Sequence, residues 1–264
     1  MSIITLLSDF GLRDSYVAEM KGVILSIKPD AVIIDITHQV EPFNVRMGAY
    51  ILARAAPRFP PGTIHVAVVD PGVGTSRRSI VVEGRRSFYV GPDNGLLVLA
   101  AKREGVKGVY EIRNPKYLPE EVSGTFHGRD IFSRVAAYLA KGVPPSDFGP
   151  ELKRYVQPSY TQVKRVCGGL VGEVVHIDNF GNIVTNISEE YMEEIGVQKG
   201  ALLCVDLAGK GLRLRFCSAY GEVPIGTPLA IIGSGGFLEL SINQGDAARK
   251  YGSRVSDRVE VTLE

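Results

Sequence analysis

Residues 3–27 read IITLLSDFGLRDSYVAEMKGVILSI, and this stretch decides the fold of the first half of the chain. The apolar run from Ile3 to Leu7 predicts a buried strand, which ends at Ser8. The apolar residues after it have the spacing of one helix face: Val17, Met20, Val23, Ile24 and Ile27. A strand, a loop and a helix in this order predict the start of an α/β domain.

The same alternation continues along the first 158 residues. We expect further strands at 31–36, 63–69, 79–82 and 87–90, and helices at 45–56, from Asn94 onward, and at 129–140. The turn Glu83–Arg86 predicts a hairpin between two of these strands. Alternating helices and strands indicate a mainly parallel sheet with helices packed on it.

The pattern changes in the region 150–166, where Pro150 and Pro158 lie among polar residues. Beyond it, short strands with turns between them are expected at 171–177, 183–187, 202–207, 212–217, 229–232, 237–242 and 258–263. We therefore predict an α/β domain over residues 1–158 and a smaller all-β domain, a barrel or a sandwich, over residues 166–264.

Composition limits the classes of partner. The 264 residues include 30 basic and 29 acidic side chains, without a Lys/Arg block of the kind that binds nucleic acid or anionic membranes. The start of the sequence lacks a signal-peptide pattern, and no run of 18 apolar residues occurs. Three cysteines without CxxC spacing suggest neither a disulfide framework nor a zinc site. We expect a cytoplasmic protein whose partner is a small molecule.

Polar residues that follow predicted strands are the first candidates for a site, because ligands of α/β sheets bind beyond the carboxyl ends of the strands. Asp9 follows the first strand, with Asp14 near the next helix start, and either residue could instead form a turn or a helix cap. Asp70 and Arg77 lie seven residues apart across a Gly-rich loop, where a structural ion pair is an equal alternative. His127 opens a predicted helix, among small and polar neighbours.

Two segments of the second half could also contact a ligand. The cluster Asp178-Asn179-Phe180-Gly181-Asn182 lies between two predicted strands, where it forms either a plain hairpin or a purine site with a stacking ring and a pairing amide. The Gly-rich turn around Ser234 precedes the strand that carries Glu239, and its glycines allow a ligand near the backbone.

Taken in order, six motifs resemble those of one family. They are SDFGxxD, VVDPGVG, GPDNGLL, FHGRD, IDNFGNIVTN and GSGGFLELSIN. Together they resemble the S-adenosylmethionine hydrolases, also called hydroxide adenosyltransferases, which are relatives of the fluorinase and the chlorinase. The resemblance covers nearly the whole chain, and it implies an α/β domain followed by a β-barrel.

The resemblance also implies roles for individual residues. Asp70, Arg77 and His127 match the residues that position water, and Asp9 matches the ribose-binding carboxylate. Asn182 matches the residue that binds adenine, and Asp178 and Ser234 match residues that bind the methionine end. The remaining candidate substrate contacts are Asp14, Asn94, Phe180 and Glu239.

The reaction implied is attack of water on the ribose C5′ carbon of S-adenosylmethionine, which releases adenosine and methionine. Arg77 would stabilise the developing hydroxide, and either His127 or Asp70 would accept the proton. No metal and no cofactor besides the substrate are expected. The family further implies a homotrimer with sites at subunit interfaces.

Three other functions fit parts of the pattern. The first is a halide-using adenosyltransferase, although its known members have Tyr where this chain has Asp70 and His127, and a charged Asp70 would repel a halide. The second is a sensor that binds S-adenosylmethionine or adenosine without turnover. The third is a metal-dependent hydrolase built from Asp9, Asp70, His127 and Asp178, which no HExxH spacing supports.

Overall fold

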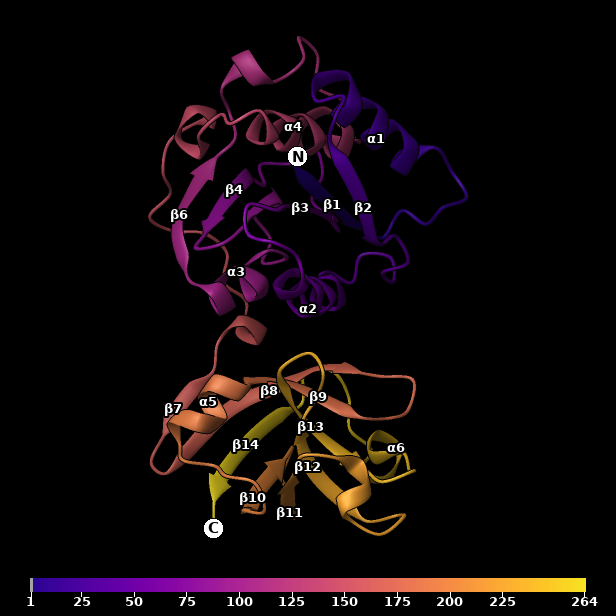
Figure 1. Cartoon of the computed structure of the whole chain (residues 1–264), viewed down its shortest axis with the longest axis vertical. Coiled ribbons are helices and arrows are strands. Elements are labelled where there is room, and N and C mark those ends of the chain that lie inside the picture. The colour runs from indigo at the N-terminus through magenta and orange to yellow at the C-terminus, as the bar shows by residue number, and fades with distance from the viewer. Residues whose placement is uncertain (1) are drawn as a thin grey trace. The chain divides into compact units, whose positions relative to one another are not determined.

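The computed structural model describes residues 2–264, and the chain divides into two units, Met1–Pro158 and Ser159–Glu264 (Figure 1). The division lies inside the region 150–166, where the sequence pattern changes. Every helix among residues 2–264 is too short or too polar to span a bilayer.

The first unit contains a six-stranded sheet with the order β2-β1-β3-β5-β4-β6. Its strands are β1 (Ile3–Ser8), β2 (Val32–Thr37), β3 (Ile64–Val68), β4 (Ser79–Gly84), β5 (Phe88–Pro92) and β6 (Val106–Glu111). β1 runs parallel to β2 and β3, and β3 runs parallel to β5. β4 runs antiparallel to both of its neighbours, β5 and β6, and with β5 it forms the predicted hairpin. The predicted mainly parallel sheet is confirmed.

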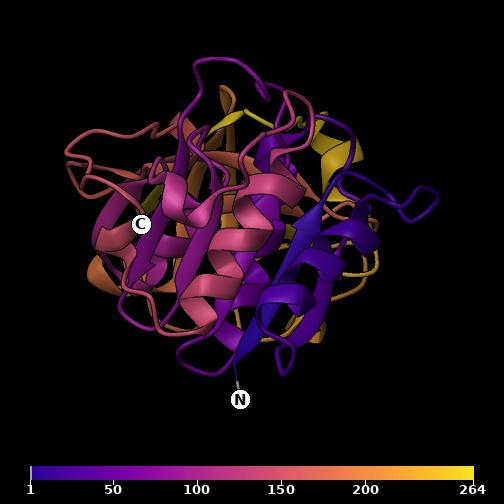
Figure 2. The same ribbon diagram turned by 90° about the horizontal axis from the view of Figure 1, so that it is seen from above.

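Helices cover both faces of this sheet (Figure 1). They are α1 (Tyr16–Ile27), α2 (Val45–Ala55), α3 (Val98–Glu104) and α4 (Arg134–Ala140), with 3₁₀ turns at Ala56–Arg58, Pro115–Tyr117 and Pro145–Phe148. α1 and α4 lie side by side on one face, as Figure 2 shows from above, and α2 and α3 lie on the other. The core beneath α1 and α4 includes Ile4 and Leu6 of β1, Met20 of α1 and Val135 of α4.

The structure differs from the sequence prediction at two helix starts. The helix expected at 129–140 begins as a π-helical turn, Gly128–Ser133, in which the Ser133 hydroxyl donates to the Gly128 carbonyl at 2.7 Å, and then continues as α4. The helix expected from Asn94 begins at Val98, because the Asn94 side chain is used in the loop before it.

The second unit is a closed barrel of seven strands in the order β8-β9-β13-β12-β11-β10-β14, in which β14 pairs again with β8. The strands of this unit are β7 (Lys164–Val166), β8 (Gly169–Ile177), β9 (Ile183–Ser188), β10 (Leu202–Leu207), β11 (Lys210–Cys217), β12 (Pro228–Ile232), β13 (Phe237–Ile242) and β14 (Arg258–Leu263). β7 adds a short hairpin partner to β8. The helices are α5 (Glu189–Glu194) and α6 (Ala247–Tyr251), with 3₁₀ turns at Ser159–Thr161 and Tyr220–Glu222. Of the two expected architectures, the barrel is confirmed.

Candidate active site

The carboxyl ends of the parallel strands bring two of the predicted acids to the same edge of the sheet. Ser8, the last residue of β1, pairs with Val68, the last residue of β3. The loops that carry Asp9 and Asp70 therefore leave the sheet at the same edge. This edge is where the sequence analysis expected a ligand.

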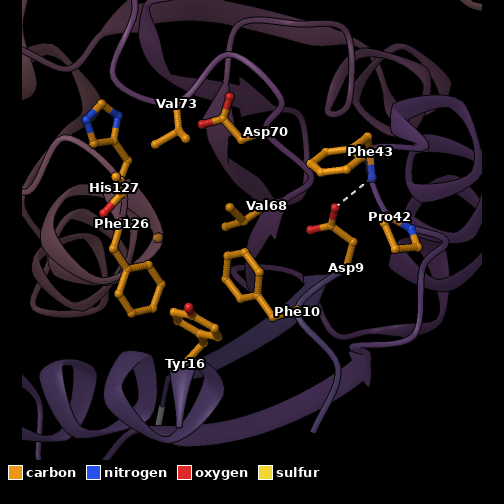
Figure 3. Close-up of a pocket in the computed structure, with 12 residues that line it drawn as sticks. Asp9, Phe10, Tyr16, Pro42, Phe43, Val68, Asp70, Val73, Phe126 and His127 are labelled. Carbon is orange, nitrogen blue, oxygen red and sulfur yellow. Dashed lines mark hydrogen bonds between the residues drawn. The ribbon is translucent and has the colours of Figure 1, made fainter. Parts of the chain in front are cut away.

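A pocket of about 400 Å³ opens at this edge. Residues from five segments line it: Asp9, Phe10, Tyr16, Pro42, Phe43, Val68, Asp70, Val73, Thr125, Phe126, His127 and Gly128. Figure 3 shows Asp70 and His127 on the upper side and Asp9 with Phe43 on the right, while the rings of Phe10, Tyr16 and Phe126 lie along the lower side. The pocket thus combines polar groups with an apolar wall, as small-molecule sites usually do.

Asp70 and Arg77 form a buried, bidentate ion pair. Arg77 Nε donates to Asp70 Oδ1 at 3.1 Å, and Arg77 Nη2 donates to Asp70 Oδ2 at 2.6 Å. The side chains are 5% exposed for Asp70 and 8% exposed for Arg77. This fork-to-carboxylate geometry fixes the carboxylate plane as well as its distance.

Arg77 also holds three further groups. Nη1 donates to the Arg78 carbonyl at 3.0 Å and to the Ser79 hydroxyl at 2.9 Å, and Nη2 lies 2.8 Å from Nδ1 of His127. A guanidinium has five N–H groups, so each of them has an acceptor within the protein. Arg77 is not among the described residues that line the pocket, and its guanidinium instead stands over the Phe132 ring at 5.6 Å.

The contact with Arg77 determines the protonation of His127. Because Arg77 can only donate, Nδ1 of His127 must accept, and a neutral His127 then carries its proton on Nε2. Burial lowers the pKa of His127 below its ordinary value, and the positive charge of Arg77 lowers it further. His127 is therefore a neutral N–H donor at neutral pH. We refer to Asp70, Arg77 and His127 as the Asp-Arg-His cluster.

A glycine brings the two loops of the Asp-Arg-His cluster together. Gly74, between Asp70 and Arg77, has φ +75°, a conformation that residues with a Cβ rarely adopt. A Cβ atom at this position would overlap the carbonyl oxygen of Gly124, three residues before His127. The close approach of the two loops thus requires glycine.

The other predicted residues of the first unit divide into two groups. Asp9 faces the pocket, and its Oδ2 accepts the backbone N–H of Phe43 at 2.9 Å (Figure 3). Asp14 is exposed near the start of α1, and Asn94 donates to the Val69 carbonyl at 2.9 Å. Within the described part of the chain, neither Asp14 nor Asn94 lines the pocket.

In the second unit, the Asp178 carboxylate accepts hydrogen bonds within the turn between β8 and β9. Its Oδ1 accepts the backbone N–H groups of Phe180 and Asn182, each at 2.9 Å, and its Oδ2 accepts the Asn182 side-chain amide at 2.9 Å. Phe180 is 79% exposed. The hairpin interpretation therefore explains Asp178, whereas the Phe180 ring is presented to solvent and could still stack on a ligand.

Ser234 and Glu239 lie near the turn between β12 and β13. Ser234 is exposed in the turn itself. Glu239 is buried on β13, where its Oε2 accepts the Tyr220 hydroxyl at 3.0 Å. The structure thus gives Glu239 a role within the barrel, and its role toward a substrate stays a prediction.

Comparison with known proteins agrees with this arrangement. The model of the SAM hydroxide adenosyltransferase N-terminal domain matches residues 4–149, and that of the C-terminal domain of the same family matches residues 172–260. The chain belongs to the SAM hydroxide adenosyltransferase family. The two family domains match the α/β unit and the barrel, respectively.

Relatives that match over nearly the whole length of both proteins carry two kinds of name. The (R)-S-adenosyl-L-methionine hydrolase of Thermus thermophilus is 38% identical over 93% of this chain and 94% of its own length, and that of Methanocaldococcus jannaschii is 37% identical over 99% and 96%. The fluorinase of Nocardia brasiliensis is 31% identical over 99% and 97%. A crystal structure of an uncharacterized conserved protein from Thermotoga maritima has a TM-score of 0.84 at 39% identity, covering 98% of this chain and 99% of that one.

The fold adds pocket residues that sequence reasoning did not select. These are Phe10, Tyr16, Pro42, Phe43, Val68, Val73, Thr125, Phe126 and Gly128. Phe10 and Phe126 belong to the motifs SDFG and FHGRD, so these motifs were the available signal. Phe43 had none, because its loop lies 34 residues beyond Asp9 in the sequence and reaches it only through the pairing of β1 with β2.

The four-residue metal site considered from the sequence is not assembled in the structure. Over residues 2–264, no group of three or more His, Cys, Asp or Glu side chains is placed to hold a metal ion. Both carboxylate oxygens of Asp70 bind Arg77, and Asp178 closes its own turn in the second unit. The proposed set Asp9, Asp70, His127 and Asp178 therefore does not form a ligand cluster.

Proposed function

We propose that this protein hydrolyses S-adenosyl-L-methionine to adenosine and L-methionine through in-line attack of water on the ribose C5′ carbon. The observation that carries the proposal is the Asp-Arg-His cluster, which presents Asp70 and His127 to a pocket at the carboxyl edge of the sheet. Membership of the SAM hydroxide adenosyltransferase family, and relatives named (R)-S-adenosyl-L-methionine hydrolase, support the same reaction.

The chemistry places its demand on the nucleophile. Attack forms a C5′–O bond and breaks the C5′–S bond, and the electron pair of that bond converts the sulfonium to the neutral thioether of methionine. The leaving group therefore needs no acid. Water, with a pKa near 15.7, must lose a proton during attack, so the site must hold the water and accept that proton.

Within this proposal, Asp70 accepts the proton and His127 orients the water. A neutral His127 already carries a proton on Nε2, since Nδ1 accepts from Arg77, and it can only donate toward the pocket. The carboxylate of Asp70 keeps lone pairs beyond the two that bind Arg77. Held in line with the substrate carbon, such a water gains the large effective molarity of an oriented reactant, equivalent to about 7–11 kcal/mol at best.

The arrangement of Asp70 and Arg77 disfavours a halide as the nucleophile. Asp70 lines the pocket with acceptor oxygens, whereas the N–H groups of Arg77 point into the protein. A halide ion would face a carboxylate with no free N–H from Arg77 beside it, while water can donate to that carboxylate. The proposed nucleophile is therefore water.

The test is incubation of the purified chain with S-adenosylmethionine in H₂¹⁸O, followed by liquid chromatography and mass spectrometry. Equimolar adenosine and methionine with ¹⁸O in the adenosine, unchanged by added chloride, are expected. Asp70→Asn should abolish turnover, whereas Asp30→Asn, at an exposed aspartate paired with Lys28, should not. A 5′-chloroadenosine product would refute water as the nucleophile, and intact bound substrate would indicate a sensor.

Finer parts of the proposal rest on the family relationship. The names of the relatives suggest that turnover is restricted to S-adenosylmethionine with the (R) configuration. The same assay with each epimer of S-adenosylmethionine at sulfur tests this restriction. We also propose a homotrimer with sites at subunit interfaces, which light scattering of the purified chain would test, and a reaction that needs no cofactor or metal besides the substrate. Cytoplasmic location stays a prediction.

A further inference from the structure

A chain of polar side chains lies behind the Asp9 loop, outside the pocket. The Ser8 hydroxyl is 2.7 Å from Nδ1 of His38, and Nε2 of His38 is 3.2 Å from Oδ1 of Asp35. Asp35 in turn binds the Lys21 ammonium at 2.6 Å through its other oxygen. Ser8 is fully buried and His38 is 3% exposed, so solvent is excluded from this contact. The reaction proposed above does not use any of these groups.

The charge of Asp35 determines which groups donate and which accept in this series of polar contacts. Burial opposes ionisation of Asp35, but its contacts with Lys21 and His38 outweigh burial and lower its pKa, so it is a carboxylate at neutral pH. Nε2 of His38 lies outside ideal hydrogen-bond geometry toward Asp35, which makes this contact mainly electrostatic. A carboxylate at this distance still favours a proton on Nε2 over a lone pair. In neutral His38, Nδ1 is then the acceptor of the Ser8 hydroxyl proton.

The oriented Ser8 hydroxyl fixes the start of the Asp9 loop. With its proton directed to His38, its oxygen accepts the backbone N–H of Phe10 at 3.3 Å. The His38 carbonyl accepts the N–H of Gly11 at 2.7 Å. His38 thus holds the backbone on both sides of Asp9. Its ring acts through the Ser8 hydroxyl, and its carbonyl binds Gly11 directly.

The same segment also holds the Asp9 carboxylate. Five residues after His38, Phe43 adopts φ +66° and donates its N–H to Asp9 Oδ2 at 2.9 Å. A positive φ is costly for a residue with a side chain, so the surrounding structure must enforce it. Residues 38–43 therefore hold both the backbone and the carboxylate of Asp9.

We propose that His38 is a positioning residue that acts through Ser8 to hold Asp9 in the orientation that binds the ribose diol. This inference rests on the proposed function, because it takes Asp9 to be the ribose-binding residue. It assigns a specific task to a buried histidine that sequence patterns alone would treat as part of the core.

The test separates positioning of Asp9 from general stability by removing the ligand group that Asp9 would bind. Calorimetry would compare adenosine with 2′,3′-dideoxyadenosine on the wild-type chain, Ser8→Ala and His38→Asn. Adenosine affinity should fall about three- to tenfold in both variants, the range expected for losing one well-placed hydrogen bond. Affinity for the dideoxy ligand should stay unchanged, because that ligand has no diol for Asp9 to hold.

Two further variants keep the experiment decisive. Thr5→Val removes a similar buried contact on the same strand, 2.8 Å between Thr5 Oγ1 and Nδ1 of His65, and should leave both affinities unchanged. Asp35→Asn changes a side chain that is 35% exposed, so it should fold even if a buried variant does not. It should weaken adenosine binding in the same direction as Ser8→Ala, by a smaller factor.

Each outcome leads to a distinct conclusion. Loss of affinity for adenosine alone would support the inference. Equal losses for both ligands, or no loss in Ser8→Ala, His38→Asn or Asp35→Asn, would overturn it while leaving the hydrolase proposal intact. A wild-type chain that hydrolyses S-adenosylmethionine but does not distinguish the two nucleosides would remove the ribose role of Asp9, and the role of His38 with it. Failure of hydrolysis itself is measured separately in the ¹⁸O experiment.

Discussion

Replacing Arg77 by lysine keeps the positive charge but removes the planar group that organises the Asp-Arg-His cluster. Arg77 makes two hydrogen bonds to Asp70, one to His127, one to Ser79 and one to the Arg78 carbonyl. A lysine ammonium has three N–H groups on one atom, and it cannot form the bidentate pair of hydrogen bonds that a guanidinium forms with a carboxylate. At least two of the five contacts are therefore lost.

The expected magnitude follows from those two contacts. Hydrogen bonds to charged groups contribute about 1.5–3 kcal/mol each, so about 3 kcal/mol is a conservative cost for two. If that cost falls on the transition state, kcat/KM decreases about a hundredfold, since about 1.36 kcal/mol corresponds to a factor of ten. An equal cost to the free energy of unfolding would lower Tm by about 6–12 °C, at roughly 2–4 °C per kcal/mol for a unit of this size.

The assay is adenosine release at 25 °C together with thermal unfolding followed by circular dichroism. Arg78→Lys is the matched control, because Arg78 also binds a carboxylate, that of Asp93 at 2.5 Å, but its side chain is 35% exposed and does not belong to the cluster. We expect Arg78→Lys to keep kcat/KM within about threefold, because neither Arg78 nor Asp93 lines the pocket among the described residues. The cost of weakening the contact with the buried Asp93 carboxylate should appear in Tm instead. Arg77→Lys with kcat/KM within threefold of wild type would refute the reasoning.

Further predictions concern pH, loop geometry and the pocket wall. Because the folded-state pKa of His127 lies below its ordinary value of 6.5, kcat/KM should be flat above that pH and decline below it. Stability should also decline as the pH falls from 6.5 toward the folded-state pKa, because the unfolded chain then binds a proton at His127 that the folded chain does not; a midpoint above 6.5 in the pH profile would contradict this. Gly74→Ala should reduce kcat at least tenfold by pushing the cluster loops apart. Gly62→Ala, where φ is also positive (+84°) but the space around the residue is open, should affect only Tm; equal effects on kcat would argue against loop contact. Phe43→Ala should raise KM about three- to tenfold through loss of ring contact, with little change in Tm because the ring is 70% exposed; an unchanged KM would place the substrate elsewhere.

Much of the fold follows from local patterns, and the exceptions have identifiable causes. Strands β10, β13 and β14 begin and end where their apolar alternation does. β6 was not predicted, because Lys107 and Gly108 interrupt its short apolar pattern, and its pairing with β4 defines it instead. β7 was also missed, since all three of its residues are exposed and only the hairpin with β8 makes it a strand.

The site was predictable to the extent that sequence spacing reflects sheet geometry. Asp9 and Asp70 follow neighbouring parallel strands, so their proximity could be expected. The two interpretations of Asp70 and Arg77, an ion pair or a site, turn out to describe one arrangement, because the paired carboxylate also lines the pocket. Phe43 could not be found, since its contact with Asp9 depends on the path of a loop between elements far apart in sequence.

The hydrogen bonds of Arg77 also change how the cluster should be interpreted. A guanidinium near a reacting water suggests a direct contact with hydroxide, and the sequence analysis expected Arg77 to stabilise it. All five of its N–H groups instead bind protein acceptors, while Asp70 and His127 face the pocket. We therefore infer that Arg77 acts by its charge and by fixing the two side chains that would contact the water in the proposed reaction. On this basis, the shape of the guanidinium matters as much as its charge, which is why lysine should be a poor substitute.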